Sequence, residues 1–160
     1  MATSNADKPE WYAKGLRFEC TQCGNCCTGA PGYVAVSEDE SRAIAKVLGI
    51  PVDDFLRKYT RKEGHGRSLR EVKSERGNDC VFLDFDEQGL AICKVYQARP
   101  LQCKTFPWWP ENLKTEASWK RLAKTCEGID RGNFVPVERI RIQRDAQAAD
   151  AGVTKQGPVR

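Results

Sequence analysis

The sequence is poor in several residue types that define large classes of protein. Leu, Ile, Val and Phe together make up about a fifth of its 160 residues, and it has one His and one Met. No apolar run approaches the roughly 18 residues that a membrane helix needs. The opening MATSNADKPEWYAKG also lacks the apolar stretch of a secretory signal. We therefore expect a cytoplasmic protein with a thin hydrophobic core and no membrane contact.

Charge and aromatic content indicate a folded chain. The 26 Lys and Arg residues exceed the 22 Asp and Glu residues by a formal net charge of +4, which is too small to keep a chain extended. Four Trp, four Tyr and six Phe residues supply side chains for packing. The length suits one domain. We place it at residues 15–147, with flexible segments at residues 1–14 and 148–160.

Eight cysteines stand out against this composition. Thiols stay reduced in the cytosol, so we interpret an even number of cysteines as metal ligands or redox groups. Four disulfides are the alternative, and they would require an export route that the sequence does not show. Zinc and the common iron–sulfur clusters both bind four cysteines, so two sites fit eight thiols most simply.

Half of the cysteines lie in one short run, CTQCGNCC at residues 20–27. Thiols at this spacing converge on a metal only where the backbone curls, which Gly24 helps it to do. The run begins like the bacterial ferredoxin pattern, but its fourth cysteine follows at once instead of three residues later. Because adjacent side chains diverge, we expect Cys26 and Cys27 to serve two different sites, or one of them to have a role other than ligation.

The other four cysteines are Cys80, Cys93, Cys103 and Cys126. Cys80 and Cys93 flank a predicted hairpin, whose antiparallel strands would bring the two thiols to the same end of the ladder. Spacing alone does not reveal which cysteine belongs to which site. The alternative is a single metal site with the remaining thiols merely buried, since free cysteine is among the most buried residue types.

Hydrophobic periodicity predicts a small α+β domain with short strands, one hairpin and three or four helices. Ser37 and Glu40 form a capping box at the start of one helix. Pro51 and Pro136 suit the first positions of two more. Residues 112–125 fit either a helix or a strand. The predicted strands are at residues 16–18, 33–36, 81–84 and 90–92, and the predicted helices are at residues 37–48, 51–59 and 136–148.

Several segments together resemble one protein family. They are CTQCGNCC, Cys80-Val81-Phe82-Leu83-Asp84, the segment from Cys93 to Pro107 with its Tyr-x-x-Arg-Pro-x-x-Cys motif, and Cys126-Glu127-Gly128-Ile129. Over residues 18–142 the sequence is similar to the CxxCxxCC, or YkgJ-like, family of zinc- or iron-chelating domains. The resemblance implies that all eight cysteines bind zinc or iron, with an iron–sulfur cluster as one form of iron. The implied ligands are Cys20, Cys23, Cys26, Cys27, Cys80, Cys93, Cys103 and Cys126.

Two features limit what the resemblance implies. Relatives tend to have Cys-Pro-Gly where this chain has Cys126-Glu127-Gly128, a change that keeps the ligand but loosens the turn. Some larger relatives resemble flagellin lysine N-methylases, yet this sequence has no glycine-rich strand–turn–helix motif for a methyl donor or a nucleotide. No catalytic triad or paired-carboxylate pattern is identifiable, so we assign no catalytic residue.

Tyr96 and Arg99 lie between two of the implied ligands. Pro100 would make the turn rigid, while the Arg99 guanidinium would donate hydrogen bonds to carbonyl groups or thiolates and offset their negative charge. We therefore place Tyr96 and Arg99 around the thiolates without making them ligands. An ordinary ion pair between Arg99 and a carboxylate such as Asp84 is the alternative.

Residues 57–76 contain eight basic and three acidic residues. A solvated surface explains such a run most simply, and a nucleic acid or an acidic protein partner is the alternative. The rings of FPWWP, at residues 106–110, would stack on bases if they lay nearby, or they would shield a metal site from water. The candidate nucleic-acid or partner surface comprises Arg57, Lys58, Arg61, Lys62, Trp108 and Trp109.

Three functions stay open at this point. The first is a metal-binding protein in an accessory, assembly or sensing role, with metal ions and a protein as partners. The second is an iron–sulfur redox enzyme or electron carrier. The third is a zinc-stabilised adaptor for nucleic acid or protein.

Overall fold

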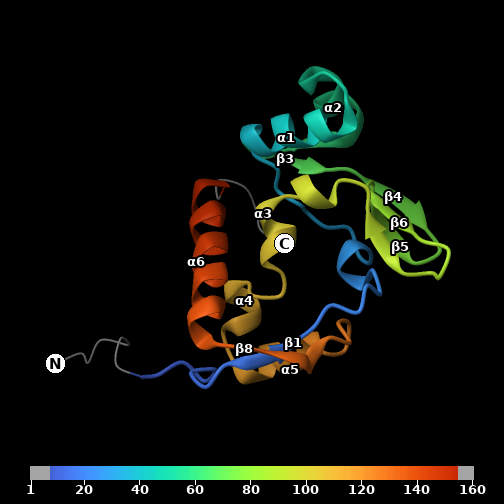
Figure 1. The fold of residues 1–160 in the computed structure, drawn as a ribbon. Helices are drawn as coiled ribbons and strands as arrows, with labels where there is room; N and C mark the ends of the chain where they lie inside the picture. Colours follow the sequence, from blue (N-terminus) through green and yellow to red (C-terminus); the bar gives the residue numbers. More distant parts are fainter. Residues whose placement is uncertain (1–7, 155–160) are drawn as a thin grey trace.

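The computed structural model describes residues 8–154, and the α+β class is confirmed. Two groups of elements lie at opposite ends of the molecule, and helix α6 (Val137–Thr154) extends from one towards the other along one side (Figure 1). Short elements occupy the region between the groups. These are η2 (Asn25–Cys27), η3 (Tyr96–Ala98) and α3 (Leu101–Thr105).

The first group contains two helices and three antiparallel hairpins. Helix α1 begins with the predicted capping box, in which Ser37 Oγ accepts from the amide of Glu40 at 3.1 Å and the Glu40 carboxylate accepts from the amide of Ser37 at 2.8 Å. Gly49 ends α1 in the left-handed conformation, with φ of 68°. The elements are α1 (Glu38–Leu48), α2 (Val52–Tyr59), β2 (Thr60–Glu63) with β3 (Gly66–Leu69), β4 (Glu71–Ser74) with β5 (Gly77–Cys80), and β6 (Leu83–Phe85) with β7 (Ala91–Cys93).

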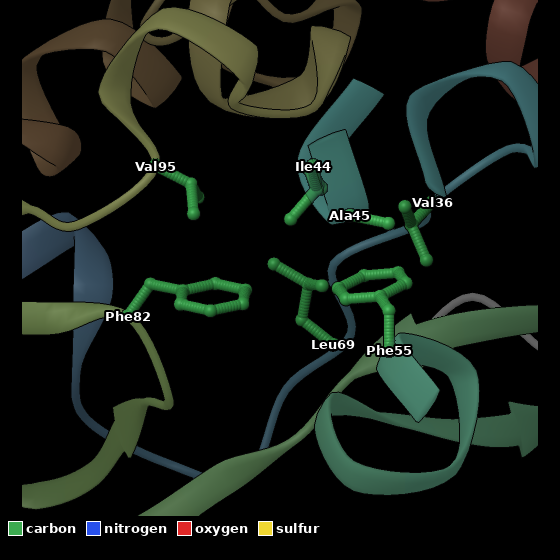
Figure 2. Close-up of a cluster of buried hydrophobic side chains, with 7 residues drawn as sticks. All are labelled: Val36, Ile44, Ala45, Phe55, Leu69, Phe82 and Val95. Atoms are coloured by element: carbon green, nitrogen blue, oxygen red, sulfur yellow. The ribbon is translucent and has the colours of Figure 1, made fainter. Parts of the chain in front are cut away.

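A buried hydrophobic cluster, the first core, holds this group together. Figure 2 shows the rings of Phe55 and Phe82 with the aliphatic side chains around them. The Phe55 and Phe82 rings are stacked with a centroid separation of 6.5 Å. Partly buried Cys80 and Cys93 pack against this core. Its buried members are Val36, Ile44, Ala45, Phe55, Leu69, Phe82 and Val95.

The second group is built around a strand pair that joins distant parts of the chain. Strand β1 (Leu16–Phe18) pairs antiparallel with β8 (Ile129–Val135), and α4 (Pro110–Leu113) and α5 (Glu116–Leu122) lie beside them (Figure 1). Its buried residues, the second core, are Tyr12, Trp108, Leu113, Trp119, Ile129 and Ile140. Cys126 packs against this core, so the two cores have different cysteines at their edges.

Several elements differ from the sequence-based expectation. Residues 33–36 contribute only an isolated bridge, from Ala35 to Ser68, instead of a strand. The structure has two hairpins beyond the predicted one, β2–β3 and β4–β5, in the basic segment. Most of residues 112–125 is helical, and α6 continues to Thr154. No helix within residues 8–154 is long and apolar enough to cross a membrane.

The segment before β1 is packed against the second group, although we expected residues 1–14 to be flexible. Tyr12 is buried, and the Trp11 indole donates to the Leu113 carbonyl at 2.8 Å. Glu10 accepts two hydrogen bonds from Arg141 of α6 and pairs with Arg144. The expectations for residues 1–7 and 155–160 lie outside the described residues.

We expect Glu10→Gln to weaken the fold near neutral pH and to have progressively less effect in acid. Hydrogen bonds from Arg141, with further help from Arg144, lower the pKa of Glu10 from 4.5 to about 2. A depressed carboxyl pKa stabilises the fold above pH 4.5, and this contribution is lost as the pH falls towards 2. Because the Glu10 side chain is 29% exposed, we expect a difference of about 1 kcal/mol at pH 7.

Urea unfolding of both proteins at several pH values measures this difference. The wild type and Glu10→Gln have the same thiols, so any effect of acid on the thiols cancels in the difference between their free energies of unfolding. Glu111→Gln is the control, because Glu111 is exposed on α4 and has no ion pair within the described part of the chain. A Glu10→Gln effect that did not shrink between pH 5 and pH 2 would contradict the linkage.

Candidate metal centre

The segment Cys20–Cys27 curls tightly enough to present its thiols on different sides. Gln22 and Gly24 both have left-handed backbone conformations, with φ of 57° and 79°. Residues 25–27 then form the single turn η2, in which the Cys27 amide donates to the Gly24 carbonyl at 3.0 Å. The predicted curl is present, and Gly24 takes part in it.

One side of this segment is fastened to the hairpins of the first group. The amide of Ala91 donates to the Gln22 carbonyl at 2.7 Å, and the Gln22 side chain donates back to the Ala91 carbonyl at 3.2 Å. Arg76 donates to the Cys23 carbonyl at 2.9 Å and to the Asn25 side chain at 3.1 Å. A Cβ atom at Gly24 would lie 2.9 Å from that of Ala91, so this close approach requires glycine.

The other side is fastened to the second group. Phe18, the last residue of β1, pairs with Ile129, the first residue of β8. This pairing brings Cys20, which follows β1, close to Cys126, which precedes β8. The Asn25 side chain donates to the Thr125 carbonyl at 3.0 Å. The backbone of Gly128 lies so close to Glu19 that a Cβ atom would be 2.1 Å from the Glu19 carbonyl oxygen.

The thiols fall into two groups of neighbours. The adjacent residues Cys26 and Cys27 lie where the two groups meet. Burial raises the pKa of Cys103 to about 12, with the neighbouring thiolates of Cys80 and Cys93 adding to the effect. Cys80 and Cys103 also raise the pKa of Cys27, after its hydrogen bond to Cys26 and its burial. The first thiol group is therefore Cys27, Cys80, Cys93 and Cys103.

Cys126 has different neighbours. Burial raises its pKa first, and the charges of Cys23, Cys26 and Cys20 add to this. Cys20, Cys23 and Cys126 form the second thiol group. The charge of Cys26 acts on members of both groups, so Cys26 lies between them.

Backbone amides point at sulfur in both groups. The Gln22 amide donates to Cys20 Sγ at 3.4 Å. For Cys80, Cys93 and Cys126, burial raises the thiol pKa, and a backbone hydrogen bond from the residue two positions later opposes that shift. The donors are Phe82, Val95 and Gly128. Such donors stabilise the thiolate, which is the form that binds metals.

The adjacent pair Cys26 and Cys27 has its own contact. Their sulfur atoms are 3.8 Å apart, and one of the two thiols donates a hydrogen bond to the other sulfur. This hydrogen bond lowers the pKa of Cys26 to about 7 and raises that of Cys27. One proton shared between two vicinal sulfurs leaves one of them ready to act as a ligand at neutral pH.

The donor set fits zinc or iron. All eight cysteines are free thiols, and soft thiolates are the ligands that these metals favour. Among the side chains that the structure describes, no three Cys, His, Asp or Glu residues are arranged so that they could hold a metal ion. Binding of an ion would therefore require the thiols to turn towards one another.

Arg99 and Tyr96 lie beside the first thiol group. The Arg99 guanidinium stacks on the Tyr96 ring at 3.8 Å from its centroid and donates to the Tyr96 carbonyl at 3.1 Å. Its positive charge opposes the rise in the pKa of Cys93 and of Cys103. Asp84, the alternative partner that we considered for Arg99, pairs instead with Lys94 at 3.6 Å.

The basic and aromatic candidates do not form one surface. Arg57, Lys58, Arg61 and Lys62 lie on α2 and β2, at the opposite end of the molecule from α4, which Trp108 and Trp109 precede (Figure 1). Trp108 is 6% exposed and stacks on Trp119. The Trp109 indole donates to the Gln102 carbonyl at 2.9 Å.

Much of the basic run serves the fold. Arg67 and Arg70 donate to backbone carbonyls of Leu56 and Thr60, and Arg61 donates to the Gly32 carbonyl at 2.6 Å. No sequence pattern marks these arginines, or Arg76, as residues that hold the backbone in place. A run of arginines looks the same in the sequence whether its side chains are solvated or donate to backbone carbonyls.

Comparison with known sequences identifies a family and a curated relative. The family described as "CxxCxxCC: Putative zinc- or iron-chelating domain" matches residues 19–127. An uncharacterized protein of Methanocaldococcus jannaschii, MJ0661, is 37% identical over 98 residues, which cover 61% of this chain and 48% of the relative. This chain therefore spans about half the length of that relative. No solved structure matches the sequence.

We expect Gly128→Ala to destabilise the protein by about 1–3 kcal/mol, the usual cost of overpacking. The new methyl group would press against the Glu19 carbonyl and separate β1 from Cys126. Gly66→Ala is the matched control, because its Cβ would meet its nearest neighbour, the Tyr33 hydroxyl, at an ordinary 3.5 Å. Urea unfolding at pH 7 measures both variants. Equal stability of the two would refute the close approach.

Proposed function

This chain belongs to the CxxCxxCC family of zinc- or iron-chelating domains, and on that premise we propose that it binds zinc or iron in two four-thiolate sites. The first site comprises Cys27, Cys80, Cys93 and Cys103. The second comprises Cys20, Cys23, Cys26 and Cys126. The separation of the thiols into two groups at the edges of two cores is the observation that carries this proposal.

The vicinal pair is divided between the sites for a geometric reason. Side chains of adjacent residues diverge, and Cys26 and Cys27 lie where the two groups meet. Cys27 has neighbours in the first group, so Cys26 is the thiol that completes the second. Amides directed at sulfur in both groups support a ligand role, because they stabilise the thiolate before any ion arrives.

Solvent exposure supports an accessory, assembly or sensing role. Cys20 and Cys26 are exposed, whereas the four thiols of the first site are partly buried. A metal in the second site would be accessible to a partner protein or a competing chelator, while the first site would hold its metal more firmly. The metal would supply a positive charge that keeps the thiolates ionised and cross-links the two cores.

Metal analysis of anaerobically purified protein tests the proposal. We expect about two metal ions per chain, following four cysteines per site, or about four to eight iron atoms if each site holds an iron–sulfur cluster. A colourless protein indicates zinc, whereas broad visible absorption indicates an iron–sulfur cluster. Reversible bleaching by a reductant would favour the alternative of a redox protein or electron carrier. Protein that contained neither metal and had its thiols paired as disulfides would overturn the proposal.

Pairs of serine substitutions test the division of ligands. Cys80→Ser with Cys103→Ser removes two ligands from one site and should leave about one metal per chain. Cys80→Ser with Cys126→Ser removes one ligand from each site and should leave both sites impaired. Both variants lose two thiols, so each controls for the other, and circular dichroism reports whether the fold persists. Equal metal content in the two variants would contradict the division.

We expect Arg99→Ala to lose metal about tenfold faster to a chelator than the wild type, because residues that support ligands typically contribute tenfold or more. Arg99→Lys keeps the charge but not the planar stack on Tyr96, so its loss rate should lie between the two. Stopped-flow transfer of metal to a coloured chelator measures the rates. Identical rates in all three proteins would show that Arg99 does not support the site.

A further inference from the structure

A groove of about 490 Å³ lies between α1 and the segment that runs from η3 into α3. It contains no cysteine. We propose that this groove binds a small organic molecule bearing two or more oxyanion groups. Its volume falls in the range of small-molecule sites. Three cations line it, Lys46 from α1, Arg99 after η3, and Lys104 from α3.

These cations have no ion-pair partner in the part of the chain that the structure describes. Within residues 8–154, no carboxylate pairs with Lys46, Arg99 or Lys104. Among the described residues, the Arg99 side chain donates one hydrogen bond, to the Tyr96 carbonyl, which carries no formal charge. Three positive groups around one groove repel each other, and an anion would relieve that repulsion.

The two acids of the groove are already engaged. Asp39 accepts from Arg42 at 2.7 Å. The two carboxylate oxygens of Glu40 accept from the backbone amides of Ser37 and Leu101, at 2.8 Å and 2.7 Å. Glu40 therefore joins α1 to the start of α3 and fixes the width of the groove. Asp39 is paired with Arg42, whereas Glu40 keeps its negative charge, so the three cations exceed the unpaired acid of the groove by two charges.

The shape of the groove favours an organic anion. Arg99 is held flat against Tyr96, so the remaining N–H groups of its fork are oriented in advance to meet a carboxylate or phosphate in a bidentate manner. Ala43 and Val47 lie one turn apart on α1 and add apolar surface between the cations. A ligand with oxyanions at the ends of a short carbon chain matches this arrangement of cations with apolar side chains between them.

Calorimetric titration of the full chain tests the proposal with two probes. Tricarballylate represents polycarboxylates and lacks the hydroxyl group with which citrate holds metal ions. 3-Phosphoglycerate, which has a carboxylate and a phosphate at the ends of a three-carbon chain, represents phosphate esters. We expect at least one probe to bind, more weakly at higher salt because exposed charges are screened. Binding of only one probe identifies its class as the ligand. If neither probe binds at low ionic strength, the proposal is wrong.

Matched charge changes decide whether the groove itself is responsible. Lys46→Gln with Lys104→Gln should weaken binding at least tenfold. Lys58→Gln with Lys62→Gln changes the net charge equally at exposed positions on α2 and β2, outside the groove, and should change the affinity less than twofold. Lys46→Gln alone, at an exposed position, should give an intermediate loss. Equal losses in the two double variants would assign binding to overall charge and overturn the proposal.

Metal binding is measured separately on the same variants. Neither Lys46 nor Lys104 is a proposed ligand, but Lys104 directly follows Cys103, so the metal content of the double variant is determined alongside its affinity. Failure of the metal proposal would appear in the metal analysis, whereas failure of the groove proposal would appear in the affinities of variants that keep the metal content of the wild type. Amide chemical shifts of residues 97–99 provide a second readout. They should move with a binding probe in the wild type and not in Lys46→Gln with Lys104→Gln.

Discussion

The segment Cys20–Cys27 is attached to both hydrophobic cores, and the arrangement of the thiols depends on that attachment. Ala91 and Arg76 hold it to the hairpins of the first group, and Thr125 and Gly128 hold its other side to the second. None of these hydrogen bonds uses a cysteine side chain, so they fix the course of the chain without holding the thiols. The backbone curl at Gly24 therefore allows the cysteines of this segment to face both groups of elements.

The two cores are small, which explains why the thiols matter to the fold. Seven residues are buried in the first core and six in the second. Cores of this size contribute little free energy of unfolding, so small domains usually need another source of stability. In the proposed sites, a bound ion whose ligands come from distant parts of the chain would supply it, because the unfolded chain has no preformed site. Cys27 and Cys103 lie far apart in sequence, so an ion between them would close a long loop.

Local signals predicted much of the secondary structure. The capping box at Ser37 located α1, and alternating apolar residues located β1 and the β6–β7 hairpin to within two residues. The β2–β3 and β4–β5 hairpins were not predicted, because their strands are mostly polar and have no hydrophobic period. Arg67 and Arg70 donate to the carbonyls of Leu56 and Thr60, eleven and ten residues earlier in the chain, and no local apolar pattern signals such contacts.

The candidate ligands could be predicted from the sequence, but their division into two groups could not. That division follows from the pairing of β1 with β8, which brings Cys126 back to Cys20, and a bulge after Arg17 sets its register. No local pattern encodes a pairing over such a separation. The position of Arg99 could not be predicted either. Arg99 lines the groove beside the first thiol group, and that groove exists because Glu40 of α1 accepts a hydrogen bond from the Leu101 amide at the start of α3. If both proposals hold, one guanidinium serves two sites, because its charge opposes the rise in the pKa of Cys93 and of Cys103 and its side chain lines the groove.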